Sequence, residues 1–283
     1  MIYIRPHRCT GFRNPILCCI SFAMLSFATP LRAQFVYVLN VGSGNTVGDS
    51  ALGYVINPAN GTLSLAPGSP FTTGLGPVAV TADPLGRFVY VANSAGNSIS
   101  GYAISETNGN LLPLHGSPYD LTPLPPFVAV IPENLAVDLA GKVLYAASLI
   151  NPTEYIAIVS AYTINQFTGA LTLIAGSPTG IGDCGVPIGI AIEPRGKFIY
   201  FSCEDSRVIA GIAIDSATGA LTTIPGSPFV LSPRVSHSGT AVAVDPSGKY
   251  VFAPVYRGVD VFAIDAATGA LGLTGFPQEL QNR

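Results

Sequence analysis

Apolar and small polar residues alternate in short runs along most of the chain, and the runs recur in a fixed order. The clearest copy has runs at 78–82, 87–92 and 99–104 and a fourth run that begins at Leu111. The turns between the runs include Asp83-Pro84-Leu85-Gly86 and Asn108-Gly109. Aspartate and proline favour the start of a turn, and glycine adopts the positive φ that ends it. The pattern therefore predicts antiparallel units of four strands joined by tight turns.

This unit recurs five times. Its second strand begins at Phe35, Phe88, Val143, Phe198 and Tyr250, which gives a period of 52 to 55 residues. Four units end in Gly-Ser-Pro (68–70, 116–118, 176–178 and 226–228), and Gly275-Phe276-Pro277 is a degenerate fifth copy. Proline cannot donate a hydrogen bond to a ladder, so we expect it to end the outer strand. A period of about 50 residues with four strands is typical of β-propeller blades.

The predicted fold is all-β, a propeller of about five four-stranded blades in which the first blade lacks its inner strand. Composition agrees with this prediction. Charged residues make up 10% of the chain, while 31 glycines and 24 prolines suit many short strands joined by turns. With no tryptophan, the chain lacks the Trp-Asp signature of one common propeller repeat.

Residues 1–33 differ from the rest. Arg5, Arg8 and Arg13 precede an apolar stretch that runs from Pro15 to about Ala28, and Leu31-Arg32-Ala33 offers small or apolar residues before Gln34. This arrangement predicts a secretory signal peptide, so that residues 34–283 form a single propeller domain that is secreted or periplasmic. The alternative is an N-terminal membrane anchor, but the apolar stretch is shorter than the roughly 20 residues that a bilayer span needs.

Removal of the signal changes the charge. The mature chain keeps 9 of 13 Lys and Arg and all 16 Asp and Glu, which gives a net charge of −7. An acidic chain without a basic cluster argues against nucleic acid or an anionic membrane as a partner. We expect the partner to be a small molecule, a carbohydrate or a protein.

Two of the five cysteines remain after signal removal, Cys184 and Cys203. They flank the first hairpin of the fourth unit. If Ile192 faces Phe198, then Cys203 lies opposite Pro187, three residues from Cys184. We expect a disulfide, because an exported protein can keep one. The rivals are two free thiols or a metal site that also uses Asp183, Glu204 and Asp205.

The segment Arg87–Asn93, the following Ile99–Tyr102 and the Ala-Thr-Gly-Ala-Leu turns at 217–221 and 267–271 resemble the β-propeller lactonase family, which includes 6-phosphogluconolactonases. The related Tyr-Val-Thr-Asn repeats of exported propellers are also similar. The resemblance covers residues 35–275 and implies a seven-bladed propeller. The chain is long enough for about five such units. Either these close a small ring, or they form an open arc prone to self-association, or the chain is a truncated form.

The resemblance also implies a Pro-Arg-His motif at the start of certain inner strands, directed at the central channel. The corresponding residues here are Pro77-Val78-Ala79, Pro132-Glu133-Asn134, Pro187-Ile188-Gly189 and Gly239-Thr240-Ala241. None carries the arginine or the histidine, and Glu133-Asn134 is the only polar pair.

The candidate catalytic residues are therefore His237, Arg234 and Glu133, which combine a possible acid–base pair with a cation. Candidate ligand-binding residues lie on the same predicted inner strand or in the loops after the second strands: Asn134, Tyr155, Arg207, Tyr256 and Arg257. Polar loop residues are often simply solvated, and no cofactor or metal motif is present.

Two functions stay open on this evidence. The first is an exported propeller that binds a ligand or partner without chemistry, with little or no activity on sugar lactones. The alternative is a lactonase, a hydrolase of a sugar lactone or cyclic ester, that replaces the missing motif with His237, Arg234 and Glu133.

Overall fold

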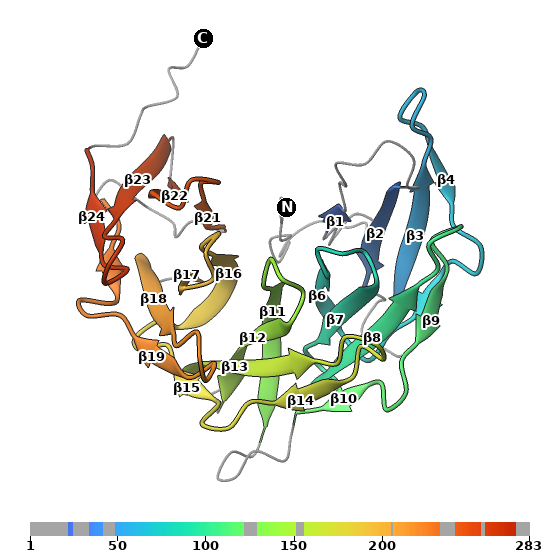
Figure 1. Cartoon of the computed structure of the whole chain (residues 1–283), viewed down its shortest axis with the longest axis horizontal. Coiled ribbons are helices and arrows are strands. Elements are labelled where there is room, and N and C mark those ends of the chain that lie inside the picture. The colour runs from blue at the N-terminus through green and yellow to red at the C-terminus, as the bar shows by residue number, and fades with distance from the viewer. Residues whose placement is uncertain are drawn as a thin grey trace, which may run out of the picture. The chain divides into compact units, whose positions relative to one another are not determined.

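The computed structural model describes residues 22–24, 34–41, 49–121, 129–150, 156–204, 206–232, 241–255 and 258–275. Within these ranges all regular secondary structure is β-strand, and no helix could span a membrane. The strands form five antiparallel sheets, each built from strands that follow one another along the chain (Figure 1). The predicted all-β architecture of about five repeated sheets is confirmed.

The first sheet contains β1 (Phe22–Met24), β2 (Gln34–Asn40), β3 (Ser50–Ile56), β4 (Leu63–Leu65) and β5 (Phe71–Thr72). The second contains β6 (Pro77–Ala82), β7 (Phe88–Asn93), β8 (Ser98–Ile104), β9 (Leu111–Pro113) and β10 (Tyr119–Asp120). The third contains β11 (Val130–Val137), β12 (Val143–Ile150), β13 (Ile156–Ile164), β14 (Leu171–Leu173) and β15 (Thr179–Gly180).

The fourth sheet contains β16 (Val186–Ile192), β17 (Phe198–Glu204), β18 (Val208–Ile214), β19 (Leu221–Thr223) and β20 (Phe229–Val230). The fifth contains β21 (Ala243–Val244), β22 (Tyr250–Val255), β23 (Gly258–Ile264) and β24 (Leu271–Leu273). The turn aspartates act as predicted, since Asp83 Oδ1 accepts the N–H groups of Arg87 at 2.6 Å and Phe88 at 3.2 Å.

The outer strand ends before the Gly-Ser-Pro segment, as expected, but the pairing resumes in a short strand after the proline, which the sequence pattern did not predict. In the first sheet β4 pairs with one end of β3, and after Pro70 the chain returns as β5 to pair with the other end. The serine fills the gap in the ladder, because Ser69 Oγ accepts the Gly53 N–H at 3.1 Å. Ser117, Ser177 and Ser227 accept in the same way. The peptide bond between serine and proline is cis in all four copies.

The first sheet also differs from expectation, because it does not lack its inner strand. β1 pairs with β2 through Phe22↔Val38 and Met24↔Val36. The partner strand comes from the apolar stretch that we assigned to the signal peptide, since its short extended run can use the free edge of β2.

Contacts group the chain into two compact units, residues 1–144 with 163–172 and residues 145–162 with 173–283. In the first unit a buried cluster joins Phe35, Tyr37 and Leu39 of the first sheet to Val89 and Val91 of the second. In the second unit Phe198 and Tyr200 of the fourth sheet meet Val251, Ala253 and Phe262 of the fifth. Neighbouring sheets thus bury apolar faces against each other, as in a propeller.

Candidate functional site

The inner strands of the second and fourth sheets begin with the same irregularity. Pro77 pairs with Asn93 and Ala79 with Ala92, so Val78 is the extra residue of a β-bulge. Pro187 pairs with Cys203 and Gly189 with Ser202, which places Ile188 in the same position. Bulges of this kind redirect a side chain and occur often next to active sites. The bulged residue is the one that aligns with the family arginine.

A polar cluster lies beside this bulge in the second sheet. Asn93 ends β7, is fully buried, and donates from Nδ2 to Ser98 Oγ at 3.2 Å and Ser100 Oγ at 2.9 Å. Ser100 Oγ also accepts the N–H of Gly74 at 3.2 Å. Asn93 Oδ1 is buried and has no hydrogen-bond partner among the residues that the structure describes. Asn93 was missed as a site residue, although its equivalent Asn40 at the end of β2 makes the position visible in the repeat.

Gly74 has to be small because of Asn93. A Cβ atom at Gly74 would lie 2.6 Å from Asn93 Cγ. The loop before the inner strand therefore packs directly on the side chain that ends the second strand, and this contact holds the start of β6 in place.

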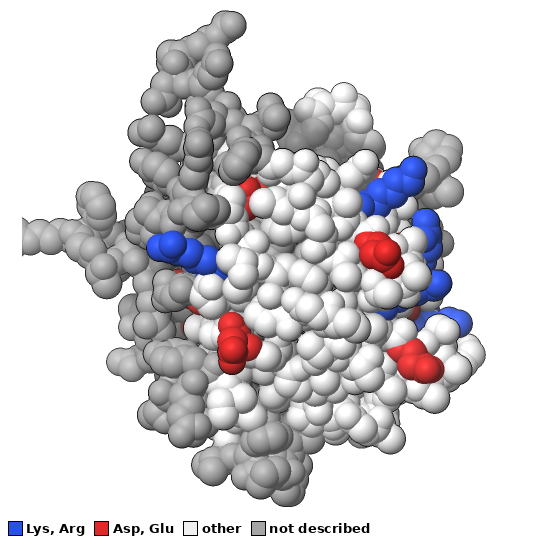
Figure 2. Space-filling model, turned by 90° about the vertical axis from the view of Figure 1, so that its left-hand side faces the viewer, with Lys and Arg blue, Asp and Glu red and all other residues white. Residues whose placement is uncertain are grey.

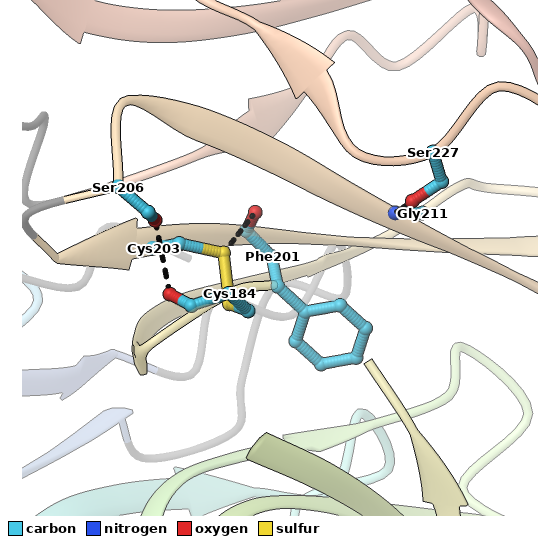
Figure 3. The surroundings of a disulfide bond; sticks show 6 residues. All are labelled: Cys184, Phe201, Cys203, Ser206, Gly211 and Ser227. Atoms are coloured by element: carbon cyan, nitrogen blue, oxygen red, sulfur yellow. Dashed lines mark hydrogen bonds between the residues drawn. A yellow bond between two sulfur atoms is a disulfide. The ribbon is translucent and has the colours of Figure 1, made fainter. Parts of the chain in front are cut away.

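In the fourth sheet a disulfide takes the place of this contact, and the predicted bond is confirmed. Cys184 and Cys203 are bonded with a Cα–Cα distance of 5.0 Å and a sequence separation of 19, the separation that Gly74 and Asn93 also have. Both cysteines are buried. Figure 3 shows Ser206 on the adjoining turn, where its hydroxyl donates to the Cys184 carbonyl at 3.0 Å. The bond therefore fastens the loop before β16 to the end of β17.

The predicted register was right at the cysteines and wrong at the turn. Cys203 lies opposite Pro187 as expected, but Ile192 faces Ile199 and not Phe198. The bulge at Ile188 absorbs the difference of one residue. A bulge leaves no signal in the alternation of a run this short.

The positions that align with the family histidine leave little room for a side chain. Ala79 is 1% exposed. A Cβ atom at Gly189 would overlap Ser202 Oγ and lie 3.1 Å from the backbone nitrogen of Val242. The serine could rotate away, but the backbone of the fifth sheet would have to move. In the second and fourth sheets these positions are therefore tightly packed.

Among the inner strands described at these positions, that of the third sheet alone has polar residues there. Glu133 and Asn134 lie on β11 and are 9% and 2% exposed. Asn134 Oδ1 accepts the Leu135 N–H at 2.8 Å, which fixes the orientation of the amide. A carboxylate can activate water as a general base, and an amide can donate a hydrogen bond to an oxyanion.

Of the other predicted site residues, the structure describes only Arg207. Its φ is 52° and its side chain is exposed, while its carbonyl accepts the Leu231 N–H at 2.9 Å. This agrees with a loop residue and assigns it no ligand. The remaining candidates, His237, Arg234, Tyr155, Tyr256 and Arg257, lie outside the described residues.

Within the described ranges, no three His, Cys, Asp or Glu side chains come together as a possible metal site. The disulfide also removes both cysteines from the rival metal site.

Comparisons with known proteins identify the family and agree with the fold. A family model described as "Lactonase, 7-bladed beta-propeller" matches residues 31–125 and 131–235. The periplasmic gluconolactonase of Pseudomonas aeruginosa is similar in structure, with a TM-score of 0.64 at 20% identity, over 90% of this chain and 71% of that chain. A Lactobacillus plantarum protein has a TM-score of 0.60 at 19% identity, over 89% of this chain and 69% of its own.

At these identities the two structures support the fold alone. A comparison with curated proteins gave no match. The family model covers more than half of the chain, including β2 to β20 and the bulged inner strands. The chain therefore belongs to the lactonase family of seven-bladed β-propellers.

Proposed function

We propose that this protein is a lactone hydrolase that acts on a sugar lactone such as gluconolactone. Family membership over residues 31–125 and 131–235 is the observation that carries the proposal. Family membership favours a lactonase over a propeller that binds a ligand without chemistry. The substrate class is suggested by the similar periplasmic gluconolactonase.

Glu133 is the proposed general base. It takes a proton from water as the water oxygen attacks the lactone carbonyl carbon. The Asn134 amide donates to the oxyanion that develops on the carbonyl oxygen. Collapse of the tetrahedral intermediate breaks the ring C–O bond, and the proton passes to the departing oxygen, which leaves a hydroxy acid. His237 and Arg234 remain sequence-based candidates for assisting the leaving group and for binding a carboxylate.

The test is hydrolysis of glucono-δ-lactone, followed by acid release and corrected for the spontaneous reaction. Glu133→Gln should lower kcat by roughly 10²- to 10⁴-fold, the contribution of a general base. Glu106→Gln, in the exposed turn after β8, should leave the rate unchanged. The change in kcat of His237→Ala and of Arg234→Ala measures how much each loop residue contributes to the reaction. Wild-type turnover in Glu133→Gln would contradict the assigned base.

Binding without catalysis is the second candidate, and the tight packing at Ala79 and Gly189 favours it. In that case no lactone is hydrolysed above the spontaneous rate, while calorimetry still detects a sugar lactone or its acid. Gly189→His would not create activity, because the added ring has to displace the backbone at Val242.

We also propose that the protein is exported. The disulfide suits an oxidising compartment, and the first 33 residues have the features of a signal peptide.

A further inference from the structure

The two ends of a sheet differ in the charges they carry. An inner strand begins at one end of its sheet and reaches a tight turn at the other. In the second sheet, the end where β6 begins is a row of paired residues, Pro77, Asn93, Ser98 and Asp120. We call the end where the inner strand begins the site end, because Glu133 lies in the first half of its inner strand, β11. The opposite end is the turn end.

Lysine and arginine in the first compact unit lie at the turn ends. Between residues 34 and 144 the sequence contains only Arg87 and Lys142, and each comes just after the turn that ends an inner strand. The Arg87 side chain forms an ion pair with Asp83 at 2.7 Å and donates to the Gly141 carbonyl at 3.3 Å. Because Gly141 belongs to the turn of the third sheet, the turn ends of the second and third sheets lie side by side.

The site ends of the same unit carry acidic residues. Asp49 lies just before β3, and its Oδ2 accepts the N–H of Gly76, just before β6, at 2.7 Å. Asp120 lies on β10 and is exposed. Glu133 lies on β11, which packs against β6. An anionic group bound near Glu133 therefore meets carboxylates, and residues 34–144 supply no lysine or arginine at this end.

We propose that the site accepts an uncharged sugar lactone and discriminates against a phosphorylated one, an inference that rests on the proposed hydrolase function. A phosphate monoester brings a charge of about −1.5 to −2 at neutral pH. Glu133 is five residues before the turn that starts at Asp138, so about 16 Å of strand separates it from the turn end. This distance exceeds the Debye length of about 8 Å at physiological ionic strength, so the cations at the turn end do not offset the repulsion.

The hydroxyl groups of an uncharged sugar suit the same surroundings. A hydroxyl donates to a carboxylate oxygen and accepts from an amide N–H, which are the groups that Glu133 and Asn134 carry. Charge at the site end therefore separates two substrates that share one lactone ring.

The experiment compares kcat/KM for glucono-δ-lactone and 6-phosphoglucono-δ-lactone, each corrected for spontaneous hydrolysis. We expect the uncharged lactone to be favoured roughly tenfold or more at low salt. The preference should shrink between about 0.01 M and 1 M salt, because the Debye length falls from about 30 Å to about 3 Å. Equal or better use of the phosphorylated lactone at low salt would overturn the proposal.

Leu75 and Leu85 provide a matched pair of variants at the two ends of β6. Leu75 lies just before the strand and is 46% exposed, and Leu85 lies in the turn after it and is 47% exposed. Leu75→Lys adds a cation at the site end and should raise kcat/KM for the phosphorylated lactone, relative to the uncharged one, by roughly 2- to 5-fold at low salt. Leu85→Lys adds the same charge at the turn end and should leave the ratio unchanged. Equal ratios in the two variants would contradict an origin at the site end.

Failure of the proposed hydrolase function has a different signature, since neither lactone is then hydrolysed above its spontaneous rate. In that case calorimetry with glucose and glucose 6-phosphate tests the charge preference by itself. Binding of glucose that is tighter than binding of its phosphate would support the preference. Tighter binding of glucose 6-phosphate, or binding of neither sugar, would overturn it.

Discussion

Individual polar residues in this protein repeat the same few tasks from sheet to sheet. Tyr37, Tyr90 and Tyr200 are buried, and burial raises the pKa of each hydroxyl above its ordinary value, so each remains a hydrogen-bond donor to a glycine carbonyl. Burial likewise raises the pKa of Tyr162 to about 12. The turn aspartates accept backbone N–H groups. Such groups stabilise local geometry, whereas Glu133 and Asn134 are a buried polar pair on β11.

The carboxyl group of Asp245 makes the stability of the fold depend on pH in the acidic range. The hydroxyl of Ser247, followed by the backbone amides of Tyr250, Lys249 and Ser247, lowers the pKa of the Asp245 carboxyl to about 2. An unfolded aspartate titrates near about 3.9, so the fold favours the carboxylate. The stabilisation is complete above about pH 4 and is lost as the pH falls toward about 2. Amides and hydroxyls lower the pKa of Asp215 and Asp265 in the same direction.

We therefore expect the urea midpoint of the wild type to fall between about pH 4 and pH 2. Asp245→Asn should be less stable than the wild type at pH 6, and the difference should shrink toward pH 2. A difference that stays constant over this range would contradict the assignment to Asp245.

At the scale of elements, the blades differ in the contact that holds the start of the inner strand. The second sheet holds it by packing Gly74 on Asn93, and the fourth by a disulfide at the equivalent positions. The outer edges vary less. β19 and β24 are three residues long and carry leucine, threonine and glycine. Figure 2 shows the side on which these strands lie, with charged side chains at the margins of a wide uncharged area. Short strands limit the pairing that such an edge offers to other chains.

The disulfide should matter for stability. Cys184→Ala with Cys203→Ala should lower the free energy of unfolding by about 3 kcal/mol, because the bond closes a loop whose ends are 19 residues apart. Urea unfolding measures this. The wild type in dithiothreitol should approach the double variant, and the double variant itself should not respond to the reductant. Equal stability of the oxidised wild type and the double variant would mean that the bond does not constrain the unfolded chain.

At the scale of the whole molecule, the family is a seven-bladed propeller and the described residues of this chain form five sheets. Repeated sheets stabilise one another mainly through nearest-neighbour faces, so each interface can be assessed separately. On this basis the interface of the fourth and fifth sheets resembles that of the first and second, since both bury apolar residues of facing sheets.

Processing of the N-terminus is a prediction at this scale. Mass spectrometry of the exported protein should find Gln34 at or within a few residues of the N-terminus. Cleavage would remove β1, which has three residues, and leave the seven paired residues of β2 and β3 in place. The mature first sheet should therefore persist. Recovery of intact Met1 from a membrane fraction would contradict cleavage.

Much of the fold could be predicted from the sequence, because its signals are local. Alternation at 87–92 and the turn at Asp83–Gly86 predict β7 and its neighbour β6 to within one or two residues. Because the pattern recurs with a nearly fixed period, the same strands and turns can be predicted for the other units. The cysteine pair followed from hairpin register, since two short strands joined by a tight turn leave few possible partners.

What only the tertiary structure decided depends on register shifts and on close approach between segments distant in sequence. Three features leave the local sequence pattern unchanged and so could not be predicted from it. They are the bulges at Val78 and Ile188, the return of the chain after Pro70 as β5, and the pairing of β1 with β2. In the sequence, Gly189 looks like an ordinary strand glycine. Only the packing of the backbone at Val242 shows that a side chain at this position has little room. The sequence by itself determined the repeated strands and turns, because each is set by its own few residues. The space at the inner strands was decided by how one sheet packs on the next.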